Sequence, residues 1–419
     1  MAPGMTQTET QGADASSDRF SSDTIEAVTQ VREACARIIE TKCPGSKAVT
    51  AVSDAFGIHR KLAWQVVKVA YADDPFIATR HMPPSKSMRS WLKSAKVAGI
   101  EGELIENARE AFERLEVVIK THAGSRAEFE MLIESVGQAS DTQTEEKWRQ
   151  HAFLGNSYTL GVQCRVLMSL NVLMPSEDKD DFFHSVQVRG LMGYRQTRPN
   201  VRWVVNQSVL IDDDQKDGTG MTRQPIDADG AARCGGVPVI SDFCSDPMPA
   251  LRRREADRGM MQDELLSGEV GLTGQRTLVT GEILRNVAPT YASSEGRRAH
   301  FGVGVRIPTE MLHFDLFVYK GLFGDVEREV RVFSELVTDI TFDEKDEIRV
   351  SDDVKRLGMG VSLAQAQDIP GYTDLARSVF GRLNADPSDY ELYRIRMAYP
   401  PMPATVVYRH PMLPKAERG

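Results

Sequence analysis

The fold of the N-terminal part is decided by residues 51–69, AVSDAFGIHRKLAWQVVKV. This stretch holds a glycine, Gly57, between two short segments whose apolar residues recur at helical spacing. In the second segment the intervals are four, four and three, at Ile58, Leu62, Val66 and Val69. Such spacing predicts a helix with one buried side. Gly57 supplies the turn, because glycine adopts a positive φ at low cost. The stretch therefore predicts two helices joined by a tight turn.

The side of the second segment that faces outward is polar, and it carries His59, Arg60, Lys61, Trp64, Gln65 and Lys68. Arginine and lysine bond guanine or phosphate oxygens, and glutamine bonds adenine. With these residues, 46–71 resembles the helix-turn-helix family of DNA-binding domains, in which the second helix protrudes toward base edges. Ser53 stands where that family usually has a small alanine. The resemblance implies a DNA-binding set of Arg60, Lys61, Trp64, Gln65 and Lys68.

A second basic segment follows at 82–100, MPPSKSMRSWLKSAKVAGI. A helix is expected to restart after Pro84. Its basic residues are spaced three, four and three apart, at Lys86, Arg89, Lys93 and Lys96. Residues at these intervals share a helix face. We expect this face to lie along the DNA backbone.

The distribution of charge supports a dedicated basic surface. Residues 42–100 contain ten Lys and Arg against three Asp and Glu, a local charge of +7. The whole chain carries −9, so the remainder carries −16. A basic segment inside an acidic chain is typical of a nucleic-acid contact. We expect a cytoplasmic transcriptional regulator that works as a homodimer or higher oligomer, because one recognition helix covers only a few base pairs.

Three alternatives stay open. Trp64 can pack against a neighbouring helix, which would leave the cations as a solvated face. The basic helices can instead dock on an acidic partner surface in a self-assembling scaffold protein. An enzyme, which we consider less well supported than a binding protein, would build its site in the C-terminal half from Asp212 to Asp217, His184, His300 and His313.

The remaining pattern predicts an α+β protein with an all-α N-terminal region and a predominantly β C-terminal region. Residues 1–21 are expected to be a disordered tail, because they are rich in Ser, Thr, Gln, Gly and Asp. Residues 22–100 hold the helix-turn-helix region, in which Asp23 and Glu26 form a capping box and Ser46 a helix start. Residues 101–175 are expected to be a helical connector or assembly region, with helices at about 103–121, 126–137 and 144–173. From 176 to 419 short β-branched runs predict a β-rich domain of unknown role.

The sequence predicts no cofactor, metal or membrane partner. Five scattered cysteines lack metal-ligand spacing, and no run of about 18 apolar residues occurs. LRRREADR, residues 251–258, is interpreted as a loop or helix face whose arginines are neutralised by Glu255 and Asp257.

Overall fold

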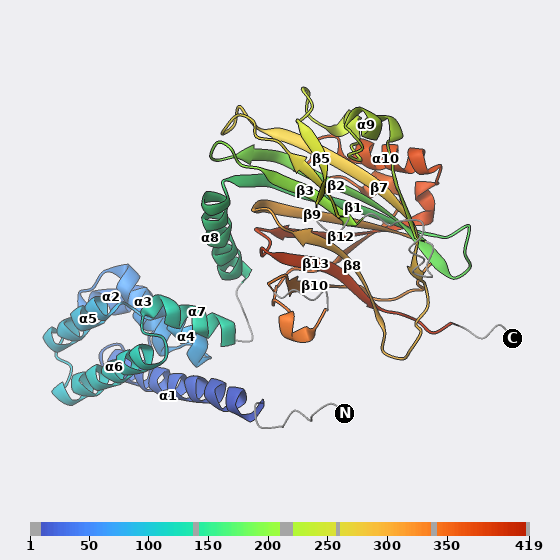
Figure 1. The fold of residues 1–419 in the computed structure, drawn as a ribbon. Coiled ribbons are helices and arrows are strands. Elements are labelled where there is room, and N and C mark those ends of the chain that lie inside the picture. The colour runs from blue at the N-terminus through green and yellow to red at the C-terminus, as the bar shows by residue number, and fades with distance from the viewer. Residues whose placement is uncertain (1–9, 137–141, 210–220, 257–259, 337–341, 416–419) are drawn as a thin grey trace. The chain divides into compact units, whose positions relative to one another are not determined.

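The computed structural model of the chain describes residues 10–136, 142–209, 221–256, 260–336 and 342–415 (Figure 1). The chain divides into two compact units, Met1–Ser140 and Asp141–Gly419, called here the N-terminal and C-terminal units. The described part of the N-terminal unit is helical, and sheets dominate the C-terminal unit. The predicted α+β class is therefore confirmed.

The helices of the N-terminal unit are α1 (Thr10–Lys42), α2 (Val49–Phe56), α3 (Arg60–Ala70), α4 (Pro75–His81), α5 (Ser85–Val97), α6 (Gly102–His122) and α7 (Arg126–Val136). The long helix α1 packs against α3, α4 and α6, and α2 packs against α3 and α5. Val28, Val31 and Ile38 of α1 are buried in this core, and so is Trp91 of α5. Packing against α1 and α5 thus fixes the positions of α3 and α2 in this core.

Helix starts in this unit differ from those expected. α1 begins at Thr10, inside the stretch 1–21 assigned to a tail, so the Asp23 and Glu26 pair lies within a helix and caps nothing. α2 begins at Val49 after Ala48, without a side-chain cap, so Ser46 is not the N-cap. The short helix α4 was not predicted. Its N-cap is Asp74, whose carboxylate accepts a hydrogen bond of 2.6 Å from the N–H of Phe76.

Among the described residues, the C-terminal unit contains one seven-stranded sheet and two three-stranded sheets. The strand orders are β11-β12-β9-β1-β2-β7-β4, β10-β13-β8 and β3-β6-β5. The strands are β1 (Val162–Pro175), β2 (Phe182–Gln196), β3 (Trp203–Val209), β4 (Thr222–Pro225), β5 (Leu251–Ala256), β6 (Met260–Leu265), β7 (Arg276–Pro289), β8 (Arg298–Val305), β9 (Thr309–Tyr319), β10 (Glu329–Ser334), β11 (Lys355–Met359), β12 (Tyr390–Ala398) and β13 (Ala404–Pro411). The helices are α8 (Thr142–Leu160), α9 (Ala228–Arg233) and α10 (Tyr372–Leu383).

The helix predicted at 144–173 is wrong in its second half. α8 ends at Leu160, Gly161 follows at φ +75°, and β1 begins at Val162. β1 lies between β2 and β9 and is covered on both faces, so nearly every side chain in it is buried. A strand buried on both sides loses its alternation and resembles a buried helix in sequence. The expected connector 101–175 is accordingly split between the two units.

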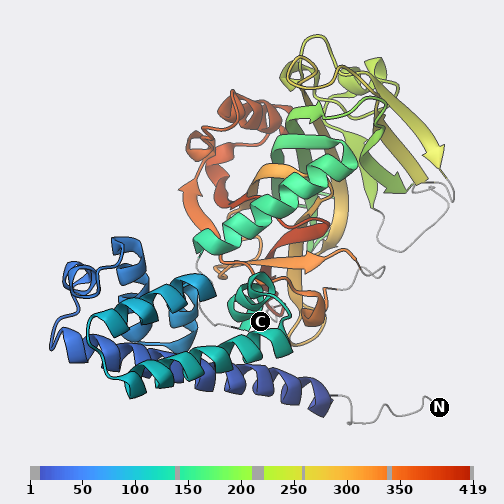
Figure 2. The same ribbon diagram turned by 90° about the vertical axis from the view of Figure 1, so that its left-hand side faces the viewer.

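The seven-stranded sheet has different layers on its two faces (Figures 1 and 2). Val166, Met168 and Leu170 of β1 pack in one cluster with residues of α10, including Leu375 and Phe380. On the other face, Leu167 and Leu173 of β1 belong to a second cluster that is shared with the β10-β13-β8 sheet. α8, which crosses the front of this unit in Figure 2, contacts β1, β9 and β12. The unit is thus a sheet between a helical layer and a second sheet.

Residues 251–256 form strand β5 in place of the expected loop or helix, and residues 257 and 258 lie outside the described residues. Its arginines pair with β6: Arg253 with Asp263 at 2.6 Å, and Arg252 with Glu264 at 2.7 Å. Glu264 is fully buried and also accepts from Arg254. Within the described residues, the neutralising carboxylates therefore come from the neighbouring strand and not from Glu255.

Within the described ranges, no helix has both the length and the apolar character that a membrane span requires.

Candidate functional site

The turn between α2 and α3 is fixed by its backbone. Gly57 has φ 62° and ψ 38°, the left-handed conformation. The N–H of Gly57 bonds the carbonyl of Asp54, and the N–H of Ile58 bonds that of Ser53 at 3.1 Å. The Ser53 hydroxyl also donates to the carbonyl of Ile58 at 2.7 Å. Ser53 therefore ties the end of α2 to the turn, a role that its place in the sequence did not reveal.

The buried side of α3 is wider than predicted. Val66 and Val69 are fully buried, as expected, but Ile58 and Leu62 are only half-buried. The other core positions are taken by Ala63, Val67 and Ala70. Small side chains on this face let α3 lie close to α1 and α2.

The outward side of α3 carries most of the predicted DNA-binding set. Arg60, Lys61 and Lys68 are exposed, Trp64 is 41% exposed, and Gln65 is half-buried. Within the described part of the chain, none of the three cations forms an ion pair with a carboxylate. Lys61 and Lys68 are seven residues apart, about two turns, so they share one face of the helix, and Arg60 precedes Lys61 directly in the first turn.

Trp64 fits both interpretations that the sequence left open. Its ring meets the ring of His81 in α4 edge to face, with 5.0 Å between the centroids. The same ring keeps two fifths of its surface exposed between the cations of α3. The indole therefore packs partly on α4 and partly belongs to the outer surface.

The predicted basic face of α5 is exposed, but it has acidic neighbours. Arg89, Lys93 and Lys96 line a groove of about 370 Å³ between α5 and α6. Glu113 and Glu116 of α6 line the same groove. Lys86 is exposed at the first turn of α5. Glu113 also pairs with Arg109, which lines the groove too, and the carboxylates across the groove reduce the positive potential of the α5 cations.

The residues proposed for an enzyme site have separate surroundings. His184 accepts a hydrogen bond of 3.0 Å at Nδ1 from the N–H of Asn286, and His300 stacks on Phe342. Burial lowers the pKa of both histidines. Asp212 to Asp217 lie outside the described residues. Where the chain is described, no group of three His, Cys, Asp or Glu could hold a metal ion.

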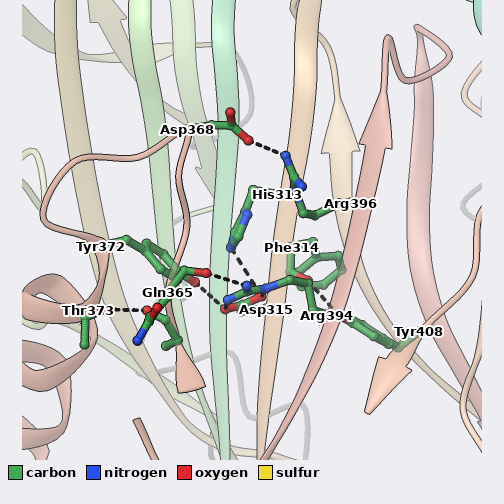
Figure 3. Close-up of polar contacts among 11 residues, drawn as sticks. His313, Phe314, Asp315, Gln365, Asp368, Tyr372, Thr373, Arg394, Arg396 and Tyr408 are labelled. Atoms are coloured by element: carbon green, nitrogen blue, oxygen red, sulfur yellow. Dashed lines mark hydrogen bonds and ion pairs between the residues drawn. The ribbon is translucent and has the colours of Figure 1, made fainter. Parts of the chain in front are cut away.

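His313 belongs to a buried polar cluster that joins β9, β12 and α10 (Figure 3). Arg394 contacts both carboxylate oxygens of Asp315, at 2.7 Å from Nε and from Nη2. The Tyr372 hydroxyl donates to the same carboxylate at 2.9 Å, and His313 Nε2 lies 3.3 Å from it. Burial alone would raise the pKa of Asp315, but the contacts with Arg394 and His313 outweigh it and lower that pKa.

The geometry of this cluster is that of a structural tie. Asp315 is fully buried, and Arg394 also donates to the carbonyl of Gln365 at 2.6 Å. A bidentate ion pair and a tyrosine bond satisfy the Asp315 carboxylate within the protein, whereas the ring nitrogens of His313 form no hydrogen bond with the described residues. The cluster holds α10 and the preceding loop against the sheet. The sequence gives one hint of this cluster: a charged residue interrupts each of two apolar strands, Asp315 in β9 and Arg394 in β12.

No family model matches the chain, and no curated protein or solved structure matches it either. The outer face of α3 is the sequence-predicted surface whose side chains are most suited to a ligand.

Proposed function

We propose that the chain binds DNA through α3, as a helix-turn-helix protein that regulates transcription. The observation that carries the proposal is the row of exposed cations on α3, Arg60, Lys61 and Lys68, which the described residues leave without carboxylate partners. Exposed cations on one helix neutralise phosphates along a groove edge, and their guanidinium or ammonium donors bond guanine. The fixed turn at Gly57 holds α3 in one direction relative to α2.

The start of α3 supplies a second argument. Arg60 and Lys61 occupy its first turn, and this turn contains no acidic residue. The N-terminus of a helix carries a partial positive charge, so cations there are unfavourable by about 0.3–1 kcal/mol each. A bound phosphate would offset this cost, because the helix end and both side chains attract the same anion. A local arrangement that opposes helix stability is typical of a functional surface.

A single α3 contacts only a few base pairs, so we propose a homodimer on half-sites one DNA turn apart, about 34 Å. Gln65 lies between the cations and is the side chain suited to adenine. The C-terminal unit is proposed to carry oligomerisation or sensing.

The test compares two double variants of the full chain that lose equal charge. Arg60→Ala/Lys61→Ala removes the first-turn cations of α3. The control, Arg37→Ala/Lys120→Ala, removes exposed cations of α1 and α6. Both are incubated with mixed genomic fragments at low and near-physiological salt, and bound DNA is sequenced.

Wild type and control are expected to enrich the same sequences. The α3 variant is expected to lose enrichment, and its plot of log affinity against log salt should flatten by up to about 2, roughly 0.9 for each phosphate contact removed. Equal DNA binding by both variants would refute the proposal. A Gln65→Ala variant that binds with relaxed sequence preference would identify a base contact.

A further inference from the structure

A cavity of about 290 Å³ lies in the C-terminal unit, far along the chain from the proposed DNA-binding helix. β2 and β7 form one wall, and β3 and β8 form the others. The residues that matter here are Arg189, Leu191, Trp203, Asn206, Leu278, Thr280, Val303 and Gly304. Small-molecule sites range from about 300 to 1,000 Å³, so the cavity is suited to a small ligand.

Two rows of polar side chains cross the seven-stranded sheet beside the cavity, and Arg189 and Thr280 of the first row line it. Ser169, Arg189 and Thr280 are register neighbours on β1, β2 and β7. Asn171 and Gln187 lie opposite each other in the next row. Apolar side chains occupy the flanking positions of the same sheet face, such as Leu167 and Leu173. Burying polar side chains between two sheets is unfavourable unless they form hydrogen bonds, so these rows point to a function beyond packing.

Arg189 is bonded only to neutral acceptors. Its Nη1 donates to the Ser169 hydroxyl and, at 2.7 Å, to the Asn171 side-chain oxygen. Its Nη2 lies 3.3 Å from the carbonyl of Gly302 and 3.5 Å from Oε1 of Gln187. Among the described residues Nε has no acceptor, and no carboxylate forms an ion pair with this guanidinium. The edge formed by Nε and Nη2 is the one that binds carboxylates and phosphates in a bidentate manner.

The charge of Arg189 is therefore poorly compensated. Burial lowers its pKa to about 10, and Glu282 acts in the opposite direction. Glu282 is itself paired with Arg223 at 3.1 Å. Arg306, which also lines the cavity, is exposed and paired with Glu335 at 2.8 Å. Arg189 is half-buried, and a partly desolvated cation whose partners are neutral is stabilised by an anion.

We propose that this cavity binds a small organic oxyanion, with its carboxylate or phosphate group on Arg189 and its apolar part against Leu191, Leu278 and Trp203. The Thr280 hydroxyl and the Asn206 amide supply neutral hydrogen-bonding groups beside the anion. The site is independent of the DNA-binding proposal, because it lies in the other unit of the chain.

The test titrates the full chain with benzoate, phenyl phosphate, inorganic phosphate and the neutral benzyl alcohol, and follows binding by calorimetry and thermal shift. Benzoate or phenyl phosphate is expected to bind and to raise the melting temperature of the wild type. Benzyl alcohol lacks the charge and inorganic phosphate lacks the apolar part, so both should bind at least about tenfold more weakly.

Two variants and one control localise the binding. Arg189→Met is expected to weaken the favoured anion by more than about tenfold, and Thr280→Val by about threefold to tenfold. The control is Arg377→Gln, an exposed position on α10, the helix that packs on the other face of the sheet. This variant should bind the anion as the wild type does. If Arg189→Met fails to fold, Thr280→Val alone decides.

Three results would overturn the inference. The first is a wild type that binds none of the anions. The second is anion binding that survives in both variants, since the ligand would then lie elsewhere. The third is equal affinity for inorganic and phenyl phosphate, which would remove the role of the apolar wall.

Discussion

Gly57 is the residue on which the turn before α3 depends. A Cβ built at this position meets no atom within 4 Å, so the backbone conformation alone resists substitution. Gly57→Ala is expected to lower the free energy of unfolding of the N-terminal unit by about 1 kcal/mol, because φ is 62°. Gly57→Asn should cost less, since asparagine tolerates this conformation. Urea denaturation followed by helical circular dichroism checks both, and equal losses would contradict the argument.

Asp315 is the residue whose loss should be felt most in the C-terminal unit. Asp315→Asn leaves the buried Arg394 guanidinium without its counter-charge, and we expect a loss of about 3–5 kcal/mol in stability. Tyr372→Phe removes only one hydrogen bond to the same carboxylate and should cost about 1 kcal/mol. Denaturant unfolding of the two variants measures the difference. Similar losses would mean that the charge of Asp315 contributes little.

The same carboxylate gives the stability a pH dependence of known sign. Contacts with Arg394 and His313 overcome burial and lower the pKa of Asp315 in the folded state. The folded protein therefore binds this proton less readily than the unfolded chain does. The stabilisation is complete above the ordinary carboxyl pKa of about 3.9 and is lost as pH falls through the lowered value.

We expect the stability gap between wild type and Asp315→Asn to be constant from about pH 7 to pH 5 and to narrow below about pH 4. Urea unfolding at a series of pH values measures this gap. A gap that narrows as pH rises would have the wrong sign for a carboxylate with a lowered pKa.

At the scale of the element, α3 is expected to trade stability for binding. Lys61→Glu places a negative charge in the first turn of α3, whose charged residues are both cations. The change should stabilise the helix by about 0.3–1 kcal/mol at low salt. The same change should weaken DNA binding, because it repels phosphate. Denaturation and DNA titration of one protein sample report both effects. If stability fell, the helix-end argument for an anion would be wrong.

Elements with a one-sided pattern could be predicted from the sequence, and elements without one could not. α3 and α6 follow their predicted ranges closely because each has one face in a core and one toward solvent. β1 is buried on both faces, so its apolar run carried no period that distinguishes strand from helix. β5 was missed because its arginines belong to pairs with Asp263 and Glu264, and such pairing across strands leaves no local signal.

The candidate site divides in the same way. The outward positions of α3 follow from helical spacing, so Arg60, Lys61 and Lys68 could be predicted. The hydrogen bond from Ser53 to the turn depends on a distance and could not. Arg189 gained its place from the register of three strands, two of which are separated by about a hundred residues. Its only sequence trace is the alternation of polar and apolar residues in SVQVRG, residues 185–190.

At the scale of the whole molecule, each unit has a hydrophobic core of its own. Leu115 of α6 and Leu375 of α10 are both 1% exposed, and they belong to different cores. Leu115→Ala and Leu375→Ala are each expected to cost about 2–5 kcal/mol. In scanning calorimetry of the full chain, each variant should lower the melting temperature of one transition. If either variant lowered the melting temperatures of all transitions equally, the two cores would unfold together.

The parallel pairing of β1 with β9 sets the order in which the protein can be completed on the ribosome. α1 to α7 emerge with their own core before β1 is made, and they can fold at once. β1 meets β2 within a short hairpin, but its other neighbour begins only at Thr309, and β13 closes the second sheet at Pro411. For about half of the synthesis of this unit, β1 therefore has one edge without a neighbouring strand. In nascent chains arrested before β9, the N-terminal unit is therefore expected to be folded. The incomplete C-terminal unit is expected to aggregate unless a chaperone binds it.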